Sequence, residues 1–204
     1  MAILEHTLGI FLHPDAEWKA IRSERHSFLQ VFMSNMPILA LIPVAAAYYG
    51  ITQVGWSIAG SVTKLTPESA LSLCVFTYFA ILASVYVMGE YVNWMAHSFG
   101  VTDDGAQRHY EGTALAVYVS TPLMLAGIAM VYPEPWVVAS VMLLAIAYSV
   151  YLLYQGTPII MNIPKEQAFI YSSSIVTVAL VIAVMVMIST VIVWGMGFGP
   201  IYMD

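Results

Sequence analysis

The fold of this chain is decided by residues 169–194, whose sequence is FIYSSSIVTVALVIAVMVMISTVIVW. The stretch contains no charged side chain. A helix needs about 20 consecutive apolar residues to cross the hydrocarbon core of a bilayer. Because lipid cannot satisfy exposed backbone groups, a run of this length must be helical. The stretch therefore predicts a transmembrane helix.

Four earlier apolar runs have a similar character, at residues 31–50, 69–95, 113–132 and 136–154. Hydrophobic residues make up 60% of the chain and charged residues only 9%, whereas soluble domains carry about 25% charged residues. The composition excludes a water-soluble fold of this size. We expect an all-α integral membrane protein, a bundle of five transmembrane helices.

The pattern divides the chain into three parts. Residues 1–27 are an amphipathic N-terminal segment, residues 28–197 hold the five spans, and residues 198–204 form a short external tail. The turn 133–135 has the sequence PEP. So short a connection makes the third and fourth helices antiparallel neighbours. Pro122 should kink the third helix.

The N-terminal segment predicts a helix that begins at Pro14, a residue suited to the first helical position. Trp18 and Ile21 share one helical face. One interpretation is an interfacial helix in which Trp18 and Ile21 contact the membrane while Arg22 and Arg25 reach the headgroups. The alternative is a short cap packed on the bundle.

Lysine and arginine residues are distributed unequally between the two sides of the membrane. One side carries Lys19, Arg22, Arg25, Arg108 and Lys165, and the other carries only Lys64. Because positive charge accumulates on the cytoplasmic side, we expect the N-terminus and the loops at 97–111 and 156–167 in the cytoplasm. The C-terminus is then periplasmic.

A polar cluster is predicted near the cytoplasmic end of the second span. Glu90, Asn93 and His97 recur at helical spacing and share a face, and His109 or Glu111 from the third helix could complete the group. A carboxylate at such depth often marks an ion or proton path. The alternative is an interfacial polar cluster that caps the bundle.

Motifs of known chemistry are missing from the sequence. It holds no G-x-S-x-G, no H-E-x-x-H, no P-loop and no Rossmann glycine pattern, so we expect no enzyme, no metal and no cofactor. It also has no basic block that would bind nucleic acid.

Three segments together resemble the Yip family of Ypt/Rab-interacting membrane proteins, in its compact bacterial form. They are AVYVSTP at 116–122, which follows the FG pair at 99–100, YSVYLLYQGTP at 148–158, and IPKEQA at 163–168. The stretch from Pro14 to Ile21 is also similar to bacterial members. The loop departs from the family pattern where VTDD follows Gly100.

The resemblance implies a five-helix domain in the bacterial inner membrane, with a cytoplasmic N-terminus. It also implies a contact site in the matching motifs, where tyrosine rings offer apolar area and a hydrogen-bonding tip. The candidate contact residues are Tyr118, Pro122, Tyr148, Tyr151, Tyr154, Gly156 and Pro158. We expect the role of eukaryotic members in vesicle traffic to transfer poorly, because this chain lacks their long polar N-terminal region.

These observations favour a non-enzymatic inner-membrane protein that acts by protein or lipid contacts, as a membrane scaffold or regulator. The expected partners are the lipid bilayer and either a membrane protein or a second copy of the chain in a homodimer. The alternative function is a small proton- or cation-linked transporter or channel that uses Glu90.

Overall fold

The computed structural model of this chain consists almost entirely of helices. It describes residues 6, 9–23, 28–58, 61–96, 98 and 105–203, and every structural statement below concerns these residues. Within them, five helices are long and apolar enough to cross a membrane. The prediction of an all-α integral membrane protein with five spans is confirmed.

A short helix, α2, precedes the five spanning helices in the described part of the chain. The bounds are α2 Pro14–Ser23, α3 Phe28–Tyr49, α4 Pro67–Ala96, α5 Gly105–Ala126, α6 Pro135–Ile160 and α7 Lys165–Val193. Short helical turns continue three of them: η1 Gly50–Val54 after α3, η3 Gly127–Val131 after α5, and η4 Trp194–Phe198 after α7.

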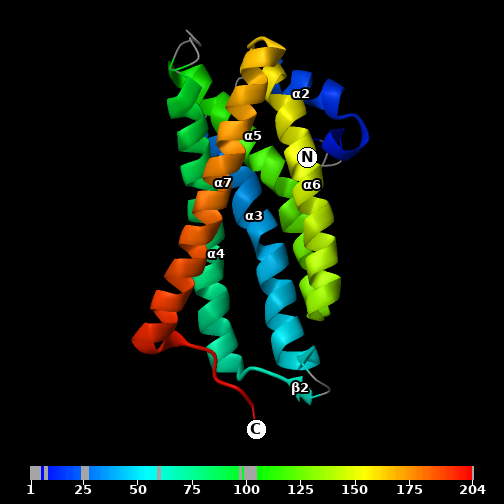
Figure 1. Ribbon diagram of the computed structural model, residues 1–204, viewed down its shortest axis with the longest axis vertical. Helices are drawn as coiled ribbons and strands as arrows, with labels where there is room; N and C mark the ends of the chain where they lie inside the picture. Colours follow the sequence, from blue (N-terminus) through cyan, green and yellow to red (C-terminus); the bar gives the residue numbers. More distant parts are fainter. Residues whose placement is uncertain are drawn as a thin grey trace.

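Helix α5 lies at the centre of the bundle and α7 at its edge. α5 packs against α3, α4 and α6, and 50% of its spanning window is buried, compared with 6% for α7. Figure 1 shows α7 leaning away from the other helices toward its C-terminal end. Where α3 passes η3, a Cβ on Gly127 would lie 2.3 Å from Cβ of Pro43, so this approach requires glycine.

Two helices extend further than hydropathy predicts. α5 begins at Gly105, so the second half of the predicted loop at 97–111 is helical. α6 continues to Ile160, which leaves residues 161–164 of the predicted loop at 156–167. Packing explains both differences, because Tyr110 and Ile160 are each only 1% exposed. Buried contacts, rather than apolar composition, set these helix ends.

A small hairpin and the C-terminal tail close the end of the bundle opposite α2, here called the hairpin end. Strands β1 Trp56–Ile58 and β2 Ser61–Thr63 pair antiparallel. The tail folds back along the residues before α4: the Thr66 N–H donates to the Ile201 carbonyl at 2.9 Å, and the Met203 N–H donates to the Lys64 carbonyl at 2.9 Å. The sequence had indicated a tail but no partner for it.

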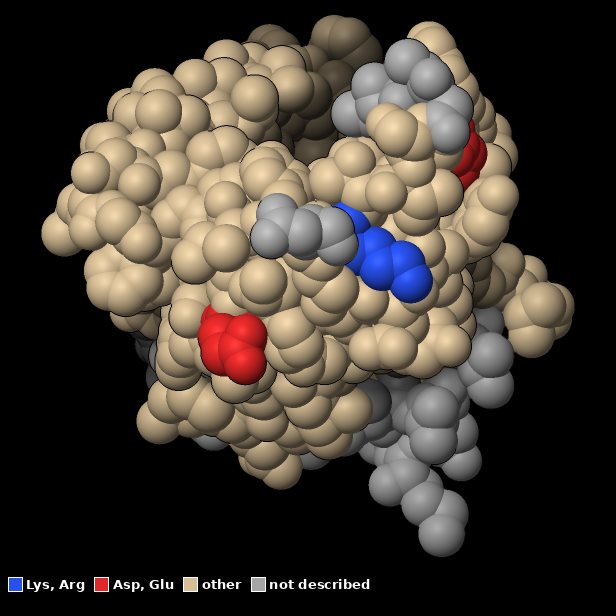
Figure 2. Space-filling view, turned by 90° about the horizontal axis from the view of Figure 1, so that it is seen from below, with Lys and Arg blue, Asp and Glu red and all other residues tan. Residues whose placement is uncertain are grey.

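The hairpin end carries few charges. Figure 2 views the molecule from this end and shows a surface that is mostly uncharged. The described charged residues nearest to it are Lys64, Glu68 and Glu134. The α2 end, in contrast, carries Lys19, Arg22 and Lys165 together with several carboxylates.

Candidate functional site

The N-terminal cap, defined here as residues 9–23, lies across one end of α5 and α6 (Figure 1). The Trp18 side chain is fully buried. A Cβ built on Gly156 of α6 would come within 2.6 Å of the Trp18 atom Cε2. The ring of Tyr118 on α5 meets the Trp18 ring edge-on, with 6.4 Å between centroids. Gly156 and Tyr118 therefore form a seat for Trp18.

This seat corrects the expectation that Trp18 and Ile21 contact the membrane. Both side chains have 0% exposure, and the bundle, not lipid, covers the apolar face of α2. The Arg22 guanidinium does not extend freely toward headgroups but donates to the Asn162 side-chain oxygen at 3.1 Å. The structure favours the packed cap, because the slot at Gly156 lets the apolar face be buried completely. Arg25 lies outside the described residues.

Polar contacts fasten the cap along its length. The Tyr148 hydroxyl donates to the Ile10 carbonyl at 3.0 Å, and the Tyr110 hydroxyl donates to the Ile21 carbonyl at 2.7 Å. Between them, the Gln155 amide donates to the Asp15 carboxylate at 2.9 Å. Each such bond contributes about 0.5–1.5 kcal/mol. Together with the buried Trp18, they hold the cap at both ends and at its middle.

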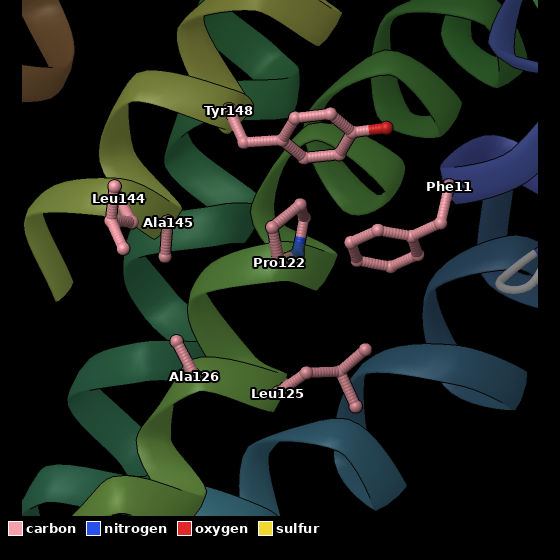
Figure 3. Close-up of a pocket in the computed structure, with 7 residues that line it drawn as sticks. All are labelled: Phe11, Pro122, Leu125, Ala126, Leu144, Ala145 and Tyr148. Carbon is pink, nitrogen blue, oxygen red and sulfur yellow. The ribbon is translucent and has the colours of Figure 1, made fainter. Parts of the chain in front are cut away.

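An open apolar hollow of about 500 Å³ lies where the start of the cap meets α5 and α6. Figure 3 shows its lining, Phe11, Pro122, Leu125, Ala126, Leu144, Ala145 and Tyr148. The Phe11 ring stacks on the Tyr148 ring with 5.3 Å between centroids. The cap thus contributes Phe11 as one wall of the hollow, and the proline of the AVYVSTP motif forms another.

The seven predicted contact residues do not form one site. Tyr118, Tyr148 and Gly156 contact the cap, and Pro122 lines the hollow beside it. Tyr151, which is half exposed, lies beside Tyr148.

The remaining two predicted contact residues lie elsewhere on α6. Tyr154 hydrogen-bonds Ser173 of α7 at 2.8 Å, and Pro158 is partly buried in the last turn of α6. Among the predicted contact residues, Tyr154 therefore joins α6 to α7, whereas Tyr118, Tyr148 and Gly156 contact the cap.

The residues around Glu90 lie where α4 and α5 approach most closely. A Cβ on Gly112 would lie 2.0 Å from the Asn93 side-chain oxygen, and one on Gly89 would lie 3.3 Å from the Thr113 Cα. Asn93 and Glu111 are buried, and Glu90 is partly buried. Asn93, a member of the predicted polar cluster on the second span, therefore lies in the contact between α4 and α5.

The two histidines of this cluster cannot be placed. His97 lies outside the described residues, and His109 belongs to α5 but its side chain is not described. Among the described residues, no group of three or more His, Cys, Asp or Glu side chains could hold a metal ion. Glu90 is not among the residues that line the apolar hollow beside the cap. The ion-path hypothesis stays a prediction.

Sequence reasoning did not predict three residues that attach the cap to the bundle: Ile10 of the cap, Tyr110 of α5 and Asn162. Two of these contacts use a backbone carbonyl, at Ile10 and Ile21, which has no sequence signature. A usable signal was Gly156, near the C-terminal end of the otherwise bulky α6, because a glycine inside a helix often has a packing reason.

Comparison with known proteins gives a family and two close relatives. The family model for the Yip1 domain matches residues 8–195. Inner membrane protein YohC of Escherichia coli strain K12 is 36% identical over 196 residues, which are 96% of this chain and 98% of the relative. The protein of the same name from Escherichia coli O6:H1 matches with the same identity and coverage. No solved structure matches this chain.

Proposed function

This chain belongs to the Yip1 domain family, and on that premise we propose that it is an inner-membrane scaffold or regulator that acts through the exposed face of its N-terminal cap. The observation that carries the proposal is the docking of the cap onto Tyr118, Tyr148 and Gly156. Residues of the family-like motifs hold the cap in one position, so its outer face is presented as an ordered surface.

The outer face of α2, unlike the apolar start of the cap at Phe11 and Leu12, carries polar side chains. Asp15, Lys19 and Ser23 are exposed, and the neighbouring turn adds Asn162 and Lys165. Elsewhere the surface is dominated by large apolar side chains of the spans. A polar, folded surface at one end of an apolar bundle suits contact with a protein outside the bilayer.

The distribution of charge supports a cytoplasmic position for the cap. Of the described lysine and arginine side chains, Lys19, Arg22 and Lys165 lie at the α2 end, and Lys64 lies at the hairpin end. The positive-inside rule then assigns the α2 end to the cytoplasm. A partner of the cap would be a cytoplasmic or membrane-associated protein.

Site-specific photo-crosslinking in native membranes tests this function. A photoreactive residue at Ala20, which is exposed on α2, should give a discrete protein adduct, whereas one at Val62, exposed in the hairpin, should not. Gly156→Leu, which displaces the cap, should abolish the adduct. The matched control is Gly195→Leu, since a Cβ at Gly195 meets no atom within 4 Å. The same adducts from Ala20 and Val62, or none from Ala20, would contradict the proposal.

A further inference from the structure

Helix α7 and the segment that follows it contact α4 near both ends of α4. Near the α2 end, the Tyr171 hydroxyl donates to the Val92 carbonyl. At the hairpin end, Ser69 donates to the Gly199 carbonyl at 3.2 Å and accepts from the Ile201 N–H at 2.9 Å. The Phe198 ring meets the Phe76 ring with 5.4 Å between centroids.

A crevice of about 430 Å³ fills the gap between these attachments. It is lined by α4, α5, α7 and the start of η4. Its limits on α4 are Leu73 and Val85, and Val186 of α7 and Trp194 of η4 bound it on the opposite side. Figure 1 shows the C-terminal end of α7 lying apart from α4. The crevice residues on α4 lie mostly in the half of that helix that begins at the hairpin end.

The lining of the crevice presents few hydrogen-bonding groups that could hold a water molecule. Apart from the indole of Trp194, its polar lining consists of five hydroxyl side chains, each of which donates to a carbonyl of its own helix. They are Thr77, Ser84, Ser120, Ser189 and Thr190. A buried water typically needs 2–4 polar partners, and apolar cavities stay dry. The occupant is therefore apolar.

The length of the crevice matches one lipid acyl chain in one leaflet of the bilayer. The distance along α4 from Leu73 to Val85 is about 18 Å at 1.5 Å per residue, and half of a hydrocarbon core is about 15 Å. An extended acyl chain that lies beside α4 over this length would therefore span one leaflet.

We propose that this crevice binds one acyl chain of a phospholipid from the leaflet at the hairpin end. The crevice is continuous with the lipid-facing surface of the spans, since Phe76 and Trp194 line it and are themselves 42% and 44% exposed. An acyl chain can enter sideways without leaving hydrocarbon. Retention then depends on packing, as between helices in a bilayer, and not on transfer from water. The proposal is independent of the cap.

Photo-labelling in lipid vesicles tests the site. The protein is reconstituted into phosphatidylcholine vesicles that contain some phosphatidylcholine with a diazirine on its acyl chain, and labelled residues are mapped by mass spectrometry. The crevice-lining residues Phe76, Ala80 and Thr190 should label several-fold more than Leu180 and Met187, which are exposed on α7 and do not line the crevice. Equal labelling would show ordinary surface lipid only and would overturn the proposal.

Filling the crevice provides the matched comparison. Ala80→Phe occupies the crevice, whereas Ala83→Phe lies on the exposed face of the same helix. Labelling inside the crevice should fall several-fold in the first variant and stay unchanged in the second. Ser189→Phe fills the crevice from an exposed stretch of α7 and should repeat the result if Ala80→Phe does not fold. Loss of labelling in Ala83→Phe, or crosslinking of a second copy of the chain at Ser189, would contradict an acyl-chain site.

Discussion

The indole ring of Trp18 lies directly on Gly156, so closely that a Cβ there would approach Cε2 to 2.6 Å. The two residues are far apart in the sequence, and this contact attaches the N-terminal cap to the fourth span. Several consequences of this arrangement can be measured.

Replacing Gly156 with alanine should loosen the cap. The added methyl group cannot fit beneath a rigid ring, and overpacking of this kind costs about 1–3 kcal/mol. Trypsin should then cleave at Lys19 and Arg22 faster in detergent than in the parent protein. Gly195→Ala, in open space, is the control. Equal cleavage rates in all three proteins would show that Trp18 does not depend on this glycine.

Tyr148→Phe should release the beginning of the cap while its end stays bound. The variant loses the hydrogen bond to the Ile10 carbonyl, a loss of about 0.5–1.5 kcal/mol, but keeps the ring that stacks on Phe11. Hydrogen exchange should accelerate at residues 9–13 and remain unchanged at residues 18–23. Tyr151→Phe, in the half-exposed neighbouring ring, should change neither. Faster exchange throughout the cap would instead indicate that it opens as one unit.

Ser69→Ala should loosen the start of the C-terminal tail, while the backbone bonds of Ile201 and Met203 to the residues before α4 remain. One hydroxyl bonds both the Gly199 carbonyl and the Ile201 N–H, so its removal loses two hydrogen bonds, each of about 0.5–1.5 kcal/mol. Amide exchange at residues 199–201 should rise, while α3 and α5 are unaffected. Ser72→Ala is the comparison, because Ser72 bonds within its own helix to Glu68. A tail that exchanges equally in both variants would not be held by Ser69.

Gly112→Ala should weaken the contact between α4 and α5. The new Cβ would meet the Asn93 side-chain oxygen at 2.0 Å and its backbone nitrogen at 3.1 Å, so the helices must separate or Asn93 must turn. We expect a fall of several degrees in the thermal midpoint in detergent, from a cost of about 1–3 kcal/mol. Equal thermal midpoints for Gly112→Ala and the control Gly195→Ala would contradict a close α4–α5 contact at Gly112.

The family-like motifs show how far sequence reasoning reached into the candidate site. Tyr118, Tyr148 and Gly156 were predicted as contact residues, and the structure brings these three together at the cap. Tyr154 was assigned to the same group but contacts α7. Position within a motif does not reveal which neighbouring element a helical face will meet, because that depends on how the helices pack.

The sequence by itself determined the number of spans and the class of fold. Length and apolarity are sufficient for this, since a bilayer accepts only segments long enough to cross it with their backbone bonds satisfied internally. Only the tertiary structure decided that Trp18 and Ile21 face the bundle, that the tail pairs with the start of α4, and that α7 diverges from its neighbours. An amphipathic helix has the same pattern whether its apolar face meets lipid or protein. The slot at Gly156, supplied by a distant part of the chain, makes the difference.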